Sequence, residues 1–390
     1  MRIWHVGASA SPKRVSGLNM SAWLMAKEQA RLGHDVTFLV HSAPDQAGRD
    51  YAEQAGFRVL HVPATVWQYE RAMIREQLDS QPPDVVHMHS VFQAKQATLA
   101  MQLRRRGIPY VIKPAGGLLP EVLERGRLQK LLFSFLLEKR RFKNAGAIAV
   151  VTPREKEPVL KFVPRYQDII RWMPNPVDTQ SLEGLKWQGS QPDTDSSTPK
   201  RVVYLGRFDV LHKGIDRLVA IARHLPDVEF HLYGTEDEKT KEWLDTIRQD
   251  QPANVVFHRP IYGTEKFQIL SEASLYIQPA RWEVFGISIA EAMYLGTPCA
   301  VADTINFAEL FQQHDLGLVF PSDAEQAAQR LSEALAHPNQ LQHWSTNAQA
   351  FAYQHFEPAA VAKNYLQLYQ DVIRNAHSAT CAKKLGVHAG

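Results

Sequence analysis

Residues 281–293 of the chain read RWEVFGISIAEAM and place two carboxylates, Glu283 and Glu291, eight positions apart around the start of a predicted helix. The preceding run, 274–279, is apolar, β-prone and closed by proline, as expected of a buried strand. Apolar residues then recur at helical spacing until a Gly-Thr-Pro run ends the helix. Glu283 is therefore predicted to lie in the loop between a strand and a helix.

The start of this helix is a predicted anion site. Gly286 lies near free backbone N–H groups and the positive end of the helix dipole, and its missing Cβ allows a ligand to approach closely. Glu283 is placed to accept hydrogen bonds from sugar hydroxyls, and Glu291, about two turns further on, reaches a hydroxyl at the other end of a ligand that lies along the helix. A sugar-diphosphate-nucleoside has this shape. The alternative is a solvated pair of glutamates, which the apolar surroundings disfavour.

Size and composition exclude several classes of protein. The 390 residues allow two domains of ordinary size, and 45% hydrophobic with 22% charged residues is typical of a soluble globular protein. A net charge of +3 is too small to indicate nucleic-acid binding, although clustered charge would suit an anionic membrane surface. Cys299 and Cys381 form no metal or disulfide pattern, and no signal peptide or membrane span is recognisable. We expect a cytoplasmic protein.

Strand-like apolar runs alternate with helical patterns along the whole chain, which predicts parallel sheets covered on both faces. The predicted strands of the first half are 3–6, 36–40, 57–62, 85–88, 110–112, 147–151 and 169–172. Those of the second half are 201–205, 228–233, 255–258, 275–279 and 299–302. The fold class is therefore α/β, with two Rossmann-like doubly wound domains that bind ligands outside the carboxyl ends of their strands.

The domain boundaries follow from the break in this alternation. We predict a first Rossmann-like domain over 1–180 and a second over 200–358. The residues between them, 181–199, are polar and rich in turn formers and are predicted to be a linker or surface loop. A helix is predicted over 359–375, and the tail 376–390 is predicted to be disordered.

The segment from Glu283 to Glu291 matches the E-x7-E signature of retaining glycosyltransferase family 4, including the Phe-Gly after the first glutamate and the Glu-Ala-Met around the second. The chain resembles that family over nearly its whole length, most specifically over 201–298. The resemblance implies the GT-B fold, with two domains facing across a cleft, an acceptor side on the first, the nucleotide sugar on the second, and the helix 359–375 crossing back. It also implies sugar transfer with retention of anomeric configuration.

Two cations lie in a glycine-bounded loop after the strand 201–205. Arg207 offers a planar fork and Lys213, six positions later, a compact charge, and together they suit a diphosphate. Taken alone they would be surface cations, but their order and spacing match the family's Gly-Arg…Lys-Gly element. The resemblance assigns Arg207, Lys213 and Glu283 as catalytic: the cations stabilise the leaving diphosphate and Glu283 holds the sugar. We therefore predict no metal and no cofactor, and interpret the D-x-D of Asp193–Asp195 as solvated.

Further residues of the donor site are assigned by the resemblance. Glu291 would hold the ribose, and Ile261 would border the base. The complete predicted donor-binding set is Gly17, Gly206, Ile261, Phe285, Gly286, Ile287 and Glu291. Gly17 follows a long small-residue loop whose alternative interpretation is a flexible connection, and only one glycine of the family's usual pair is present. No G-x-G-x-x-G follows the first strand, which disfavours a nicotinamide dehydrogenase.

The acceptor side is assigned to His89, Gly116 and Gly117. His87 and His89 share one face of a strand; no further metal ligand is apparent nearby, so we predict that one of them packs inside while His89 points at the cleft. Ala115 stands where many family members have a histidine, and Lys113 is only a weak substitute. This Pro-x-Gly loop resembles the family's polysaccharide and lipopolysaccharide assembly branch.

The segment 122–142 is both basic and apolar, with Arg125, Arg127, Lys130, Lys139, Arg140 and Arg141 among leucines and phenylalanines. A packed helix with snorkelling basic ends and a membrane-surface helix explain it equally well. The second would suit a lipid-linked acceptor, a peripheral membrane contact and a place at the inner face of the membrane.

These observations predict a retaining, metal-independent glycosyltransferase. It would move a sugar from a nucleotide sugar, such as a UDP- or GDP-sugar, to a saccharide or lipid-linked acceptor in polysaccharide or glycoconjugate assembly. One alternative is a non-catalytic nucleotide-sugar-binding subunit, motivated by the absent histidine. A second is a sugar-nucleotide epimerase of similar shape, which the Arg-Lys and E-x7-E elements disfavour. No nucleic-acid partner is expected.

Overall fold

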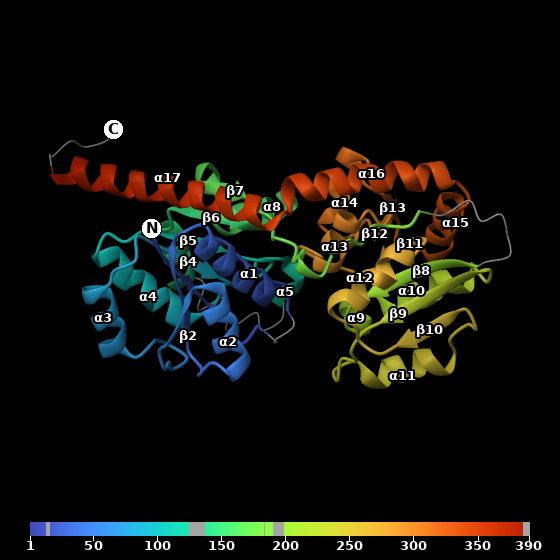
Figure 1. Cartoon of the computed structure of the whole chain (residues 1–390), viewed down its shortest axis with the longest axis horizontal. Helices are drawn as coiled ribbons and strands as arrows, with labels where there is room; N and C mark the ends of the chain where they lie inside the picture. The colour runs from blue at the N-terminus through green and yellow to red at the C-terminus, as the bar shows by residue number, and fades with distance from the viewer. Residues whose placement is uncertain (13–15, 125–136, 183, 190–198, 385–390) are drawn as a thin grey trace. The chain divides into compact units, whose positions relative to one another are not determined.

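The structure is a computed structural model that describes residues 1–12, 16–124, 137–182, 184–189 and 199–384. The chain forms two compact units (Figure 1). One unit consists of Met1–Pro176 together with the C-terminal segment from Pro358, and the other of Val177–Glu357. Each unit has its own parallel sheet, so the predicted α/β class with two doubly wound domains is confirmed.

The first unit is built on a seven-stranded sheet of order β3-β2-β1-β4-β5-β6-β7. Its strands are β1 (Arg2–Val6), β2 (Asp35–Val40), β3 (Arg58–His61), β4 (Val85–His89), β5 (Tyr110–Lys113), β6 (Ala147–Val150) and β7 (Ile170–Trp172). Its helices are α1 (Gly17–Arg31), α2 (Gln46–Ala55), α3 (Arg71–Ser80), α4 (Ala94–Arg105), α5 (Pro120–Glu124), α7 (Lys139–Lys143), α8 (Lys156–Phe162) and α17 (Pro358–Lys384).

Both faces of this sheet are buried. Ile3 packs in a core with residues of α1 and α17, whereas the next residue, Trp4, packs in a separate core with residues of α3 and α4. Successive strand residues point to opposite faces, so a strand covered on both sides is mostly apolar. This is why most of the strands appear in the sequence as largely apolar runs, with buried polar residues such as His5 and His87 as exceptions.

The second unit contains a six-stranded sheet of order β10-β9-β8-β11-β12-β13. Its strands are β8 (Lys200–Leu205), β9 (Val228–Tyr233), β10 (Val255–His258), β11 (Leu275–Gln278), β12 (Cys299–Ala302) and β13 (Leu318–Phe320). Its helices are α9 (Val210–Lys213), α10 (Ile215–Arg223), α11 (Lys241–Gln249), α12 (Gly263–Glu272), α13 (Ile287–Leu295), α14 (Phe307–His314), α15 (Ala324–Leu335) and α16 (Pro338–His355). The strand order reverses between β8 and β11, and ligands of open α/β sheets bind at such a switch point.

Two elements differ from the predictions. β13 was not predicted, because it has only three residues and follows directly on Gly317. α17 continues to Lys384, past the predicted end at 375 and into the predicted disordered tail. The sequence of this extension contains Ala376, Ala379 and Ala382, and alanine is the strongest helix former. Residues 385–390 lie outside the described residues.

The predicted linker 181–199 is partly attached to the second unit. The indole of Trp187 donates a hydrogen bond to the carbonyl of Ala273 at 2.9 Å, and its backbone N–H donates to Leu295 at 3.1 Å. These contacts make 184–189 part of the folded unit rather than a free connection. Residues 190–198, which include the D-x-D, lie outside the described residues.

Arg141 corrects one expectation for the basic, apolar segment 122–142. Its guanidinium is fully buried, 3.3 Å from the carboxylate of Glu138, and donates hydrogen bonds to Gln96 and to the carbonyl of Ser90. It is therefore an interior residue that neither snorkels nor faces a membrane. Residues 125–136 lie outside the described part of the chain, so a membrane contact there remains a prediction.

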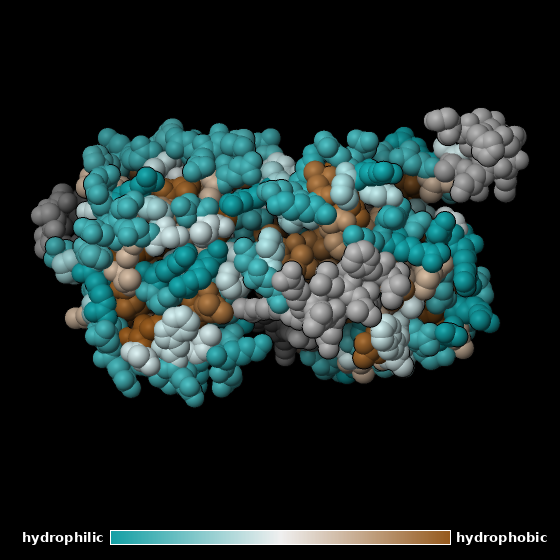
Figure 2. Space-filling model, turned by 180° about the vertical axis from the view of Figure 1, so that it is seen from behind, coloured by the Kyte–Doolittle hydropathy of each residue, from teal (hydrophilic) through white to brown (hydrophobic). Residues whose placement is uncertain are grey.

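No helix in the described ranges is long and apolar enough to span a bilayer. The face of the molecule in Figure 2 is mostly hydrophilic with smaller hydrophobic areas. Large exposed apolar side chains include Val66 and Trp67 in the first unit and Tyr262 in the second.

Candidate active site

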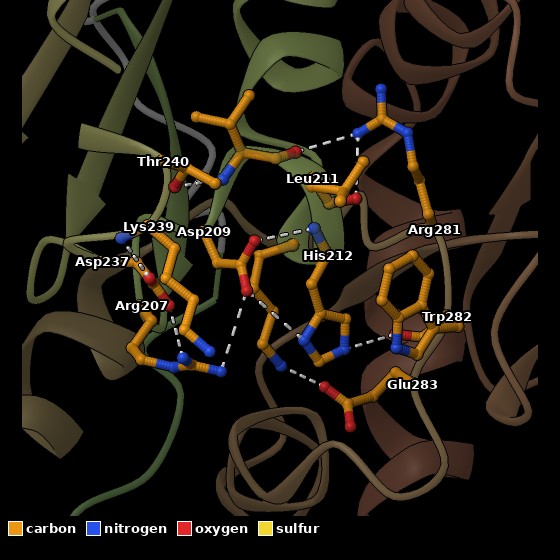
Figure 3. Close-up of polar contacts among 12 residues, drawn as sticks. Arg207, Asp209, Leu211, His212, Asp237, Lys239, Thr240, Arg281, Trp282 and Glu283 are labelled. Atoms are coloured by element: carbon orange, nitrogen blue, oxygen red, sulfur yellow. Dashed lines mark hydrogen bonds and ion pairs between the residues drawn. The ribbon is translucent and has the colours of Figure 1, made fainter. Parts of the chain in front are cut away.

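The two predicted donor elements of the second unit meet at the switch point. The loop 206–213 follows β8, and the loop 279–286 follows the neighbouring strand β11. Lys213, at the end of α9, forms an ion pair with Glu283 across 70 positions of sequence (Figure 3). The structure thus brings together two of the three residues predicted to be catalytic.

Neighbouring residues hold these two loops in place. The guanidinium of Arg281 binds both carboxylate oxygens of Asp216, at 2.9 and 2.6 Å, and donates to the carbonyl of Val210 at 2.9 Å. The ring of His212 stacks on Trp282 with centroids 4.6 Å apart, and its Nε2 lies 2.9 Å from the Trp282 carbonyl oxygen (Figure 3). A bidentate arginine bond fixes geometry as well as charge, so Lys213 and Glu283 meet within a rigid frame.

The Lys213–Glu283 pair is largely shielded from water, with side chains 16% and 15% exposed. Burial acts to raise the pKa of Glu283, but the charges of Lys213 and His212, together with hydrogen bonds, outweigh it and lower that pKa. Burial is also the main cause that lowers the pKa of His212, followed by the nearby charge of Lys213. At neutral pH the site therefore holds an ionised Glu283 carboxylate and a neutral His212 imidazole beside the Lys213 side chain.

Arg207 lies at the outer side of this group and is 52% exposed. Its guanidinium is 2.5 Å from Asp237 and 3.9 Å from Asp209, whose carboxylate also caps α9 through the backbone N–H of His212 (Figure 3). No pair joins Arg207 to Lys213 or Glu283 among the described residues. The cation predicted to bind phosphate is thus held by carboxylates but remains open to solvent.

Gly286 is the N-cap of α13, and no side chain caps this helix. The first backbone N–H groups of α13, which begins at Ile287, are therefore open to an anion, as predicted. Phe285 is buried against Phe307 and Phe356, which anchors the loop just before the helix. A Cβ at Gly286 would come within 2.5 Å of the Ile289 side chain, so a larger residue here would require that side chain to move.

Three other predicted donor residues also lie in the second unit. Gly206 follows β8, and a Cβ there would come within 2.6 Å of the Tyr204 hydroxyl. Ile261 is buried between β10 and α12. Glu291 is buried on α13, eight positions after Glu283, and pairs with Lys266 of α12, a residue that the sequence patterns did not assign.

The predicted acceptor loop of the first unit follows β5 and contains a turn with positive φ at Ala115 (47°) and Gly116 (82°). The buried carboxylate of Glu155 holds this turn by accepting hydrogen bonds from the N–H groups of Gly116, at 2.6 Å, and Val151, at 2.8 Å. A Cβ at Gly117 would come within 2.2 Å of Val91. Glu155, which no sequence pattern singles out, therefore supports this loop.

Lys113 and Gly17 are placed differently. Lys113 is buried and donates to the Ser21 hydroxyl at 2.8 Å, and burial lowers its pKa to about 7. It points into the first unit and does not substitute for the histidine that Ala115 replaces. Gly17 opens α1 directly after the N-cap Ser16, as predicted, and the residues 13–15 of the preceding loop lie outside the described ones.

His89 is not an open residue, contrary to the prediction. It is fully buried, and its Nε2 lies 3.0 Å from Nδ1 of His5, whose Nε2 in turn contacts Gln29 at 2.8 Å. His87 contacts the Tyr369 hydroxyl of α17 at 2.6 Å. Burial is the main cause that lowers the pKa of all three imidazoles, to about 4 for His5 and well below the ordinary value for His87 and His89.

These three histidines can be tested as metal ligands, because each offers a ring nitrogen within 4.8 Å of the others. The rings of His87 and His89 are stacked 4.2 Å apart at 25°, and His5 lies at 19° to His89. Lone pairs lie in the ring planes, so nearly parallel rings do not converge on one ion as a tetrahedral site requires. The arrangement suits a hydrogen-bonded core network. The register of the neighbouring strands β1 and β4 pairs His5 with His87. Sequence reasoning missed this pairing, which brings the histidines together.

Comparison with known proteins agrees with this geometry. Residues 16–175 match the family described as "Glycosyl transferase 4-like domain", and residues 188–351 match "Glycosyl transferases group 1". The chain belongs to the group 1 glycosyltransferases. Together the two matches cover most of both units, including the α9 and α13 elements around Lys213 and Glu283.

Several glycosyltransferases are similar over large parts of the chain. Alpha-maltose-1-phosphate synthase of Mycolicibacterium smegmatis is 27% identical over 316 residues, 74% of this chain and 79% of that protein. Phosphatidyl-myo-inositol mannosyltransferase of Mycobacterium leprae is 26% identical over 205 residues, 51% and 53% of the two chains. The structure of Anabaena HepE in complex with UDP has a TM-score of 0.74 at 17% identity and covers 94% of this chain and 99% of that chain. The fold is GT-B.

Proposed function

We propose that this glycosyltransferase moves a sugar from a UDP- or GDP-sugar to a saccharide or lipid-linked acceptor with retention of anomeric configuration. The observation that carries the proposal is the Lys213–Glu283 pair beside the uncapped N-terminus of α13. It places an ammonium, an ionised carboxylate and free backbone N–H groups at the switch point of one sheet, where a sugar diphosphate requires these three partners.

The donor diphosphate is bound by Lys213, Arg207 and the N-terminus of α13. Lys213 exchanges Glu283 for a phosphate oxygen, and the released carboxylate accepts hydrogen bonds from the sugar hydroxyls. The acceptor attacks on the face from which the diphosphate leaves, and the departing phosphate oxygen takes the acceptor's proton, so configuration is retained without an enzymic nucleophile. The cations stabilise the developing negative charge, so the proposed reaction requires no metal.

The similar proteins support the substrate classes. The HepE structure contains UDP. The name alpha-maltose-1-phosphate synthase includes a sugar phosphate, and the name phosphatidyl-myo-inositol mannosyltransferase includes a phosphoinositide lipid. We propose polysaccharide or glycoconjugate assembly as the process.

A second candidate is a nucleotide-sugar-binding subunit without activity. Ala115 at the family's histidine position favours it, because Lys113 is buried and does not take over that place.

The test is a thermal-shift screen of the purified full chain with UDP-glucose, UDP-galactose, UDP-N-acetylglucosamine, GDP-mannose and ADP-glucose. Donors that raise the Tm are then assayed for release of the nucleoside diphosphate, with and without saccharide or lipid-extract acceptors. A stabilising donor with acceptor-dependent release supports the transferase. A stabilising donor with no release under any condition supports the binding subunit, and no stabilisation by any nucleotide sugar contradicts both.

A further inference from the structure

Lys266 of α12 makes an ion pair with Glu291 of α13 in the second unit. Its Nζ lies 2.6 Å from Oε1 of Glu291. The Glu291 side chain is 3% exposed and that of Lys266 is 17% exposed, so the carboxylate is the deeply buried partner. Lys266 Nζ also lies 4.5 Å from the centroid of the Phe267 ring, which further fixes its position.

A carboxylate buried to this degree requires a counter-charge to remain ionised. Lys266 supplies that charge but engages only one oxygen. Among the described residues, Oε2 of Glu291 accepts no hydrogen bond, and it is not one of the fully buried unpaired atoms. The pair therefore leaves a charged acceptor oxygen available to a ligand hydroxyl.

The position of Lys266 in the fold links two parts of the donor site. α12 begins at Gly263, two residues after Ile261, which is predicted to border the base. Lys266 lies near the end of the first turn of α12, and its side chain reaches across to Glu291 on α13. The same helix thus joins the base segment to the carboxylate predicted to hold the ribose.

We propose that Lys266 is a positioning residue that makes the enzyme selective for ribonucleotides over deoxyribonucleotides. It holds the Glu291 carboxylate in one orientation through their ion pair, and Glu291 accepts the hydrogen bond of a ribose hydroxyl. Lys266 itself does not contact the donor. This inference rests on the proposed function, because it requires that the second unit binds a nucleotide sugar.

If the ion pair only stabilises the fold, a different result is expected. A neutral residue at position 266 then lowers the Tm but weakens the binding of ribonucleotides and deoxyribonucleotides equally. If Lys266 is a positioning residue, the substitution lowers the affinity for the ribonucleotide alone, because the deoxynucleotide lacks the hydroxyl that bonds to Glu291. The ratio of the two Kd values therefore separates the two roles, whatever the change in stability.

The experiment is calorimetric titration of the full chain with UDP, 2′-deoxy-UDP and 3′-deoxy-UDP, or the guanosine series if GDP-mannose is the stabilising donor. For the wild type we expect at least one deoxynucleotide to bind at least roughly tenfold more weakly than the ribonucleotide, because it loses a hydrogen bond to a charged group. Lys266→Met is expected to reduce this ratio to about twofold or less. Lys266→Arg, which keeps the charge, is expected to retain it.

The matched control is Lys241→Met, which removes an exposed ion pair with Glu236 in the same unit and should leave the ratio unchanged. In a Glu291→Gln background, Lys266→Met should have no further effect. If Lys266→Met does not fold, Lys266→Gln replaces it, since its amide can still bond to Glu291 without the charge.

The outcomes distinguish this inference from the proposed function. A folded Lys266→Met or Lys266→Gln variant with the wild-type ratio overturns the positioning role and leaves the function intact. A wild type that binds UDP and both deoxynucleotides equally overturns the ribose contact and the role of Lys266 with it. A wild type that binds no nucleotide overturns the proposed function itself.

Discussion

Replacing Lys213 by methionine tests how the donor is held, because it removes the ammonium while keeping most of the side chain. Lys213 is 16% exposed in its pair with Glu283, so its bond to a phosphate oxygen forms with little competition from water. Loss of a hydrogen bond between charged groups costs about 1.5 to 3 kcal/mol. We therefore expect the Kd of UDP or GDP to rise roughly ten- to 150-fold in Lys213→Met.

The same geometry predicts the opposite effect for the partner residue. Glu283 forms an ion pair with Lys213, so a diphosphate has to compete with that carboxylate. Glu283→Gln removes the competition, and we expect it to bind the free nucleoside diphosphate at least as tightly as the wild type. Its kcat with the complete donor should fall by roughly tenfold or more, since a neutral amide is a weaker acceptor for the sugar hydroxyls.

The assay is calorimetric titration of the nucleoside diphosphate into the wild type, both single variants and the double variant. Lys161→Met, which removes an exposed pair with Glu157 in the first unit, is the control and should bind as the wild type does. Wild-type affinity in a folded Lys213→Met variant would refute the phosphate role. Weaker nucleotide binding in Glu283→Gln would refute the competition between the two residues.

Three further results are expected. Activity should survive EDTA, because Arg207 and Lys213 neutralise the diphosphate; loss in EDTA with recovery in Mg²⁺ or Mn²⁺ would contradict this. Thermal stability should fall as the pH falls from about 6.5 to about 4, because burial lowers the pKa of His5 to about 4 and that of His87 and His89 still further, so the unfolded chain takes up protons that the folded chain does not. A Tm that stays constant over this window would show that the network is not neutral. Arg141→Met should lower the free energy of unfolding by about 3 to 5 kcal/mol, because it leaves the buried Glu138 carboxylate unpaired; a denaturant titration showing less than about 1 kcal/mol would mean that the pair behaves as a surface one.

The strands could be predicted well because burial on both faces leaves a strong pattern. β9 and β10 have the bounds predicted from their apolar runs, 228–233 and 255–258. β13 could not be found this way, since three residues, two half-buried and one buried, carry too little of any pattern. The extension of α17 was missed for a different reason: polar residues alternate with alanine there, which resembles a disordered tail although alanine favours helix.

The pairing of charges could be predicted only in part. That Lys213 and Glu283 share one edge follows from their places after β8 and β11, but their direct contact depends on how Arg281 joins the two loops. The role of Lys266 could not be predicted from the sequence, because its partner Glu291 lies on another helix 25 positions away. The prediction that His89 points at the cleft was wrong because His89 is buried against His5, a partner 84 positions away in sequence.

The configuration of the product tests the central claim most directly. With an α-configured nucleotide sugar and the acceptor that gives turnover, the anomeric proton of the first product is observed by NMR. The proposed same-face attack, with Lys213 and Arg207 on the leaving diphosphate, predicts an α-linked product. A β-linked product would require attack from the opposite face and would contradict the proposed retention.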